Sequence, residues 1–170
     1  ILSGATDRWS PETEILLFTA ARRDHLEKTV FPALERGAIV ISDRFADSTR
    51  VYQGAARNDL RETVDAVHRL MIDIEPDLTI VMVLDPEEGR RRGNARNAVA
   101  TVDEGRFERM GQGFQDRLVA GFAMLPAHFP DRCLPVNASG GIEAVAERVM
   151  AVIGPRLARP RLETGALSGP

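Results

Sequence analysis

Apolar positions along the chain follow two periods, that of an amphipathic helix and that of a buried strand. Ser10 and Pro11, followed by an acid, are typical of a helix start, because the side chain of Ser10 can cap and proline suits the first helical position. We expect a helix from there to about Arg36, ended by Gly37 and kinked in its last turn by Pro32. Its apolar row comprises Phe18, Leu26, Val30 and Leu34.

Three short, mainly apolar runs predict strands; the first is continuously apolar, as expected for a strand that is buried on both faces of a parallel sheet. They cover residues 38–41, 78–84 and 133–136. Between the first two, apolar residues recur at helical spacing after the capping candidates Asn58 and Asp59, and this row predicts a helix. The row comprises Leu60, Val64, Val67 and Met71.

Two further helices are predicted in the second half of the chain. One carries Phe107, Met110, Phe114, Leu118, Phe122 and Leu125, and is followed by Pro126; the other carries Ile142, Val145, Val149 and Val152. Residues 90–105 show no apolar periodicity and predict a mobile loop, and residues 155–170 predict a disordered tail. Helices that alternate with buried strands indicate an α/β fold with a mainly parallel sheet, in one domain over residues 1–154.

Composition narrows the function classes. No apolar run approaches the roughly 18 residues that span a bilayer, and no signal peptide begins the chain, so we expect a cytoplasmic protein without a membrane partner. Cys133 is the only cysteine, which excludes an internal disulfide. A formal net charge of −3 argues against non-specific nucleic-acid binding. A mechanism that depends on a lysine side chain could use only Lys28, because the other 21 of the 22 basic residues are arginines.

Asp43 and Arg44 directly follow the first predicted strand. In an open parallel sheet, ligands bind beyond the carboxyl ends of the strands. A carboxylate there can orient a metal ion or a phosphate, and a guanidinium matches phosphate oxygens. The dipeptide alone is equally compatible with this binding role and with a purely structural one, in which Asp43 and Arg44 supply a helix cap and a surface ion pair.

Four segments resemble the thymidylate kinases in the order of that family. DRFADSTRVYQG at 43–54 resembles the nucleoside-monophosphate site, and LLFTAARRDH at 16–25 resembles the base-binding helix. PDLTIVMVLDP at 76–86 resembles the strand before the lid, and GRFERMG at 105–111 resembles the helix after it. The resemblance covers residues 1 to about 153 and implies a P-loop nucleoside-monophosphate kinase fold.

Phe18 and Arg22 share a helix face through a spacing of four. By itself this pattern also suits a core phenylalanine and an arginine that reaches to solvent. The resemblance implies that Phe18 stacks on thymine and that Arg22 donates to its carbonyl edge. This suits the chemistry, because arginine carries donors and no acceptor.

The nucleotide segment supplies the other expected substrate contacts. By resemblance, Thr49 binds the base, Tyr52 lies under the sugar and excludes a 2′-hydroxyl, and Gln53 lines the same pocket. Arg44 is expected to hold the acceptor phosphate, and Asp43 to help position phosphates and magnesium. From the residues alone, Tyr52 is equally explained as a half-buried aromatic side chain.

Arginines crowd the predicted lid at residues 90–105. Such a run is usually a solvated face, but lid arginines in phosphoryl-transfer enzymes stabilise charge on the transferring group. By resemblance, Arg92 and Arg96 are catalytic candidates, and Arg96 and Arg106 are candidates for ATP binding. Gly105 stands where many relatives carry an acid.

The family's phosphate-binding loop, G-x-x-x-x-G-K-[ST], is absent from the sequence, and so is its Arg-Glu-Pro segment. Lys28 cannot replace the loop lysine, because it lies inside a predicted helix with no glycine before it. We expect the chain to be part of a longer kinase or the product of a truncated reading frame.

The resemblance implies phosphoryl transfer from ATP to dTMP with magnesium, in deoxynucleotide biosynthesis, by a homodimer. Two alternatives stay open at this point. One is a kinase for another nucleoside monophosphate, and the other is an inactive nucleotide-binding or dimerisation module.

Overall fold

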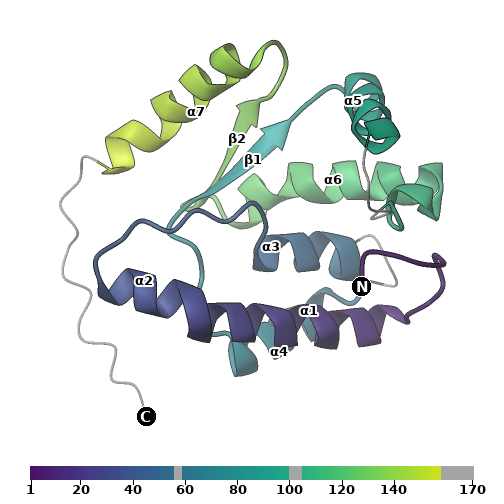
Figure 1. Ribbon diagram of the computed structural model, residues 1–170, viewed down its shortest axis with the longest axis horizontal. Helices are drawn as coiled ribbons and strands as arrows, with labels where there is room; N and C mark the ends of the chain where they lie inside the picture. The colour runs from purple at the N-terminus through teal and green to yellow at the C-terminus, as the bar shows by residue number, and fades with distance from the viewer. Residues whose placement is uncertain (56–58, 100–104, 158–170) are drawn as a thin grey trace.

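The computed structural model describes residues 1–55, 59–99 and 105–157, without the side chains of residues 94 and 96–99. Two strands and a set of helical segments follow in the order α1 (Pro11–His25), η1 (Leu26–Val30), α2 (Phe31–Glu35), α3 (Ala46–Thr49), η2 (Arg50–Ala55), α4 (Arg61–Met71), β1 (Thr79–Val83), α5 (Pro86–Val99), η3 (Glu108–Met110), α6 (Gln112–His128), β2 (Cys133–Asn137) and α7 (Ile142–Leu157). In Figure 1, α1 and α4 form one side, α3 and α6 lie in the middle, and the sheet and α7 form the other side.

The predicted first helix is confirmed, with an irregular middle. Ser10 Oγ accepts a hydrogen bond from the backbone N–H of Thr13 at 3.1 Å, and Gly37 follows the helix with φ of +76°. The chain passes from α1 through a π-helical stretch, η1, into α2. The π turn lies directly before Pro32, which has no N–H to donate to the carbonyl four residues earlier.

The strands β1 and β2 pair in parallel, with Thr79 opposite Cys133 and Val83 opposite Asn137. This confirms the strands predicted at 78–84 and 133–136. The strand predicted at 38–41 is wrong: residues 38–41 are irregular, and Ile39 and Ile41 are 71% and 90% exposed. A strand needs a hydrogen-bonded neighbour, and within the described residues the sheet holds β1 and β2 alone.

The loop predicted at residues 90–105 is also wrong over its first part, because α5 runs from Pro86 to Val99. The carboxylate of Asp85 accepts the backbone N–H groups of Glu87 at 2.9 Å and Glu88 at 3.2 Å. This cap, with Pro86 at the start and an ion pair between Glu88 and Arg92, stabilises a helix that needs no apolar face. Residues 100–104 lie outside the described part of the chain.

The core lies between η2, α6 and the sheet. Its buried residues are Val51, Val81, Phe107, Phe114, Leu118, Leu125 and Cys133. Gly121 of α6 is required there, because a Cβ at this position would lie 2.8 Å from Cγ1 of Val51. The predicted helices around 60–71 and 142–152 are confirmed. The helix predicted over 107–125 is confirmed from Gln112 onward and continues past Pro126, but residues 107–111 are not part of it, because Gly111 with φ of +85° separates the short turn η3 from α6. The predicted disordered tail is wrong at residues 155–157, which end α7, and its remainder lies outside the described residues.

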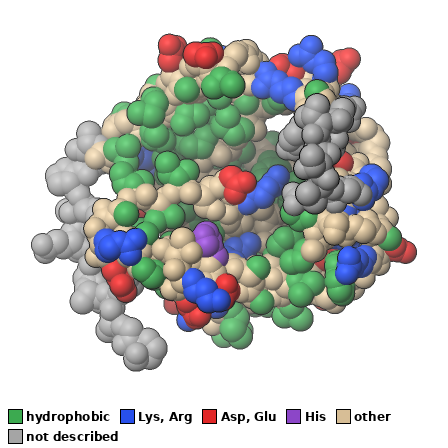
Figure 2. All heavy atoms as spheres, in the orientation of Figure 1, with side chains coloured by type: hydrophobic (Ala, Val, Ile, Leu, Met, Phe, Trp, Pro, Cys, Tyr) green, Lys and Arg blue, Asp and Glu red, His purple; other side chains and the backbone are tan. Residues whose placement is uncertain are grey.

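Apolar and charged surfaces are separated. Figure 2 shows hydrophobic side chains gathered over the sheet and α7, and charged side chains over α5. The exposed apolar residues include Met82, Val83, Ile142, Met150 and Leu157. Within the described ranges, no helix is both long and apolar enough to span a bilayer.

Candidate functional site

The predicted nucleotide segment folds into two short helical pieces, α3 and η2, preceded by Phe45 in an extended conformation. A four-residue helix is not stable alone, so tertiary contacts must hold it. Val51 of η2 packs against Gly121, which fixes the segment on α6. This arrangement presents Thr49 toward α1 and Tyr52 toward the aromatic core.

Arg22 and Thr49, which the sequence placed at the base pocket, are brought together. Arg22 Nη2 of α1 donates to Thr49 Oγ1 at 2.7 Å and to the carbonyl of Phe45 at 3.3 Å. The guanidinium carbon also lies 5.4 Å from the centre of the Phe45 ring. Burial, and next the charge of Arg50, lower the pKa of Arg22 to about 10, so it stays charged at neutral pH. A guanidinium held by neutral acceptors retains donors for a carbonyl-bearing ligand.

Phe18 and Tyr52 are half-buried side chains that pack against the aromatic core. The ring of Phe107, a core residue, lies 5.1 Å from Tyr52, edge to face, and 6.5 Å from Phe18. The guanidinium of Arg44 lies over the Tyr52 ring at 5.3 Å. Arg44 is otherwise exposed, with a 3.4 Å contact to Ser48 Oγ. Arg44 therefore lies beside Tyr52, and Phe18 and Tyr52 are both in contact with Phe107.

Two other predicted contact residues lie differently. Asp43 is exposed, close in sequence to Arg44. Gln53 is 1% exposed, and its Nε2 donates to Glu14 Oε2 at 2.9 Å. Its amide therefore faces the protein interior, and a direct substrate contact by Gln53 stays a prediction.

Arg106 belongs to the same buried polar group. It is fully buried, and its Nη2 donates to Glu14 Oε1 at 2.5 Å, with further bonds to the carbonyls of Ala5 and Thr6. Glu14 thus connects Gln53 to Arg106 and to the N-terminal segment. This geometry holds Arg106 as a structural residue, and its predicted ATP contact gains no support from it.

The two lid arginines are carried by α5. Arg92 is 42% exposed in its side chain and donates to the carbonyls of Ala138 at 3.0 Å and Gly140 at 3.1 Å. It thereby ties α5 to the loop after β2. The side chain of Arg96 lies outside the described residues. The structure does not bring Arg92 to Arg44 or Asp43 through any contact it describes.

Carboxylates that could hold magnesium are few in this region. No group of three or more His, Cys, Asp or Glu side chains is arranged for a metal among the described residues. Magnesium in phosphoryl transfer keeps waters and binds substrate phosphates through one or two carboxylates. Asp43 is an exposed carboxylate, and its magnesium contact stays a prediction.

Sequence reasoning missed a buried ionic network behind the pocket. Arg50 bonds to Asp47, Asp65 and Glu75, and Arg132 bonds to Asp47. Burial alone raises the pKa of Glu75, but hydrogen bonds from His68 and Arg50 outweigh it and lower that pKa to about 2. The spacing of three between Asp47 and Arg50 was the only sequence signal for this network.

Three comparisons with known proteins agree on one family. A family model described as "Thymidylate kinase" matches residues 1–149. A thymidylate kinase from Jannaschia sp. (strain CCS1) is 53% identical over 158 residues, covering 93% of this chain and 74% of that protein. One from Dinoroseobacter shibae is 54% identical over 151 residues, covering 89% of this chain and 71% of that protein.

A solved structure supports the same assignment. The crystal structure of thymidylate kinase from Ehrlichia chaffeensis matches with a TM-score of 0.65 and 27% sequence identity. The match covers 86% of this chain and 68% of that one. Overall fold and sequence family therefore agree, and the α/β architecture predicted from the sequence is confirmed.

Proposed function

This chain belongs to the thymidylate kinase family, and from that premise we propose that its described residues form the acceptor site of the kinase. The activity of this family of phosphotransferases is ATP-dependent phosphorylation of dTMP. The observation that carries the proposed site is the hydrogen bond between Arg22 and Thr49, because it joins the two residues that the family resemblance assigns to the base.

In the proposed complex, thymine lies against Phe18, and Arg22 donates to a thymine carbonyl while Thr49 orients the guanidinium. Tyr52 carries the deoxyribose on its ring. Arg44, which is exposed beside that ring, binds the acceptor phosphate through its planar fork. Since phosphoryl transfer depends on positioning and charge stabilisation, these contacts hold the acceptor oxygen ready for attack on the γ-phosphoryl of ATP.

Magnesium, when bound, neutralises charge on the transferring phosphates, and Asp43 is the residue we place beside it. Arg92 and Arg96 stay candidates for the lid that covers the donor side. A homodimer and a cytoplasmic location remain expectations from the family resemblance, and light scattering on the purified protein tests the first.

Replacing Arg22 tests the acceptor site directly. Arg22→Ala should weaken dTMP binding by about 1.5–3 kcal/mol, the range for hydrogen bonds to a charged group. Isothermal titration calorimetry measures this loss. Arg23→Ala is the matched control, because Arg23 is half exposed and bonds to Glu27 and the carbonyl of Met71 instead. Equal dTMP affinity in Arg22→Ala and Arg23→Ala would remove Arg22 from the pocket.

The donor side gives a second test. The 170 residues contain no G-x-x-x-x-G-K-[ST] loop to hold the ATP phosphates. Purified residues 1–170 should therefore show no dTMP-dependent ADP release in a coupled assay, while a protein that adds such a loop should be active. Robust ADP release from residues 1–170 would show that another segment holds ATP.

A further inference from the structure

Asp47 is a buried carboxylate that joins three elements. Asp47 lies in α3 and is 5% exposed. Oδ1 accepts from Arg50 Nη1 and Arg132 Nη2, each at 2.9 Å, while Oδ2 accepts from Arg132 Nη1 at 2.6 Å and Thr79 Oγ1 at 2.9 Å. Arg132 thus binds the Asp47 carboxylate in a bidentate manner through both terminal nitrogens, which is the strongest geometry for an arginine–carboxylate pair.

These bonds tether the nucleotide segment to the sheet. Thr79 begins β1, and Arg132 immediately precedes β2. Burial by itself raises the pKa of Asp47, but the hydrogen bonds and charge of Arg132, with Thr79 and Arg50, outweigh it and lower that pKa. The carboxylate is therefore ionised at neutral pH, and the tether is made of charged groups that are costly to separate when buried.

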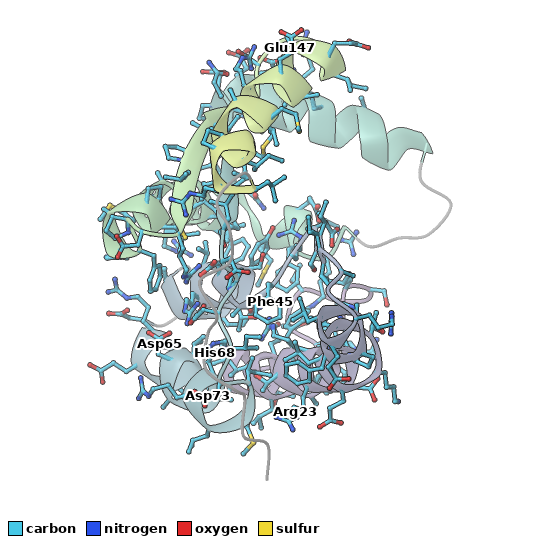
Figure 3. The ribbon with its side chains drawn as sticks, turned by 90° about the vertical axis from the view of Figure 1, so that its left-hand side faces the viewer. Arg23, Phe45, Asp65, His68, Asp73 and Glu147 are labelled. Carbon is cyan, nitrogen blue, oxygen red and sulfur yellow. The ribbon has the colours of Figure 1, made fainter. Side chains whose placement is uncertain are left out.

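A second carboxylate extends the tether to α4. Glu75 bonds to Arg50 at 2.5 Å, lies 3.2 Å from Arg132, and its Oε1 lies 3.1 Å from Nε2 of His68. Figure 3 shows His68 on α4, close to Asp65 and below Phe45. Asp65, on the same helix, bonds to Arg50 at 2.8 Å. The network thereby holds α3 and η2 between the sheet and α4.

The network also lies directly behind the base-recognition pair. Asp47 and Arg50 flank Thr49 within one helical turn, and Thr49 Oγ1 accepts from Arg22. Burial and then the charge of Arg50 lower the pKa of Arg22, and the charges of Asp47 and Glu75 act in the opposite direction to a smaller extent. The position of α3, rather than the charge of the network, therefore connects Asp47 to Arg22.

We propose that Asp47 is a positioning residue for dTMP recognition, which fixes Thr49 against Arg22 by tethering α3 to Thr79 and Arg132. The proposal rests on the acceptor site assigned above and adds a residue that touches no substrate. Without the carboxylate, α3 loses its tether to the sheet, and Thr49 is no longer held against the Arg22 guanidinium.

The test separates dTMP recognition from the rest of the enzyme, using the active protein described above, in which these residues are joined to a phosphate-binding loop. Asp47→Asn should raise the KM for dTMP by about tenfold while kcat and the KM for ATP change by less than about twofold, because it removes binding common to the ground and transition states. Thr79→Val, which deletes one hydrogen bond and nearly keeps the side-chain shape, should raise the dTMP KM by about two- to threefold. Asp24→Asn, at an exposed carboxylate paired with Lys28, is the control and should change neither KM.

A double-mutant cycle makes the result decisive. If Asp47 acts through Thr49, the effects of Asp47→Asn and Thr49→Ala on dTMP affinity should be strongly non-additive. Additive effects, or an unchanged dTMP KM in folded Thr79→Val, overturn the proposal, and the Thr79 variant decides the matter if Asp47→Asn does not fold. Arg22→Ala run in parallel separates the two hypotheses: if it also leaves dTMP affinity unchanged, the acceptor site itself is wrong.

Discussion

The nucleotide segment at residues 43–55 and the helix α5 both carry arginines, and Arg50 of the first differs from Arg91 and Arg92 of the second. Arg50 is 9% exposed in its side chain and bonds to three carboxylates. Arg91 is 78% exposed and Arg92 is 42% exposed, and the carboxylate described beside both is Glu88. The comparison shows that a buried arginine held by several carboxylates is committed to the fold, while an exposed arginine with one such partner can still bind a charged ligand.

The largest effect on stability is expected from the ion pair between Arg106 and Glu14, whose side chains are both fully buried. Glu14→Gln leaves Arg106 buried without its carboxylate, and we expect a loss of about 3–5 kcal/mol in the free energy of unfolding. Urea denaturation measures this loss. Asp24→Asn, at an exposed ion pair, should leave the midpoint almost unchanged; similar midpoints for both variants would contradict the structural role of Glu14.

The next largest effect is expected on sugar preference, from replacing Tyr52 in the proposed pocket. Tyr52→Ala should relax the preference for deoxyribose over ribose by about 1–3 kcal/mol, the usual cost of fitting an extra group into packed space. Tyr52→Phe keeps the ring, and with it the edge contact to Phe107, so it should keep the preference. Competition between dTMP and ribothymidine monophosphate measures both variants. Unchanged discrimination in Tyr52→Ala rules out the steric account.

Acid should weaken the nucleotide segment before α5. The pKa of Glu75 is lowered to about 2 from an ordinary 4.5, so its contribution to stability is complete above the ordinary value and is lost as pH falls toward 2. The free energy of unfolding should therefore drop as pH is lowered through this window. Glu75→Gln should flatten that part of the profile, and an unaltered profile in this variant would exclude Glu75 as its source.

The smallest effect is expected on α5. Arg92→Gln removes the tie to the carbonyls of Ala138 and Gly140, and should cost less than about 1 kcal/mol of global stability because the side chain is partly solvated. Hydrogen exchange should nevertheless accelerate in the backbone of α5. Arg91→Gln is the control, since its 3.8 Å contact to Glu88 is highly exposed; equal exchange rates in the two variants would show that Arg92 does not hold the helix.

Local signals in the sequence were sufficient for most elements. The cap at Ser10 and the stop at Gly37 marked the first helical stretch, and apolar periodicity marked α4, α6 and α7. Apolar periodicity does not reveal α5, and the signal that predicts its start is the capping Asp85 followed by Pro86. Its polar residues need no buried face when the cap and the Glu88–Arg92 pair supply the stability.

The sequence by itself determined the helices with apolar periodicity, the two paired strands and the family, and the resemblance assigned both Arg22 and Thr49 to the base. Tertiary structure alone decided that residues 38–41 form no strand, because pairing depends on a neighbour that local pattern does not supply. It also decided which polar and charged residues face inward: Gln53 and Arg106 meet at Glu14, and Asp47 meets Arg132 across 85 positions of the chain. A charge is tolerated in the interior only where a partner distant in sequence arrives to compensate it, and that arrival is a property of the fold.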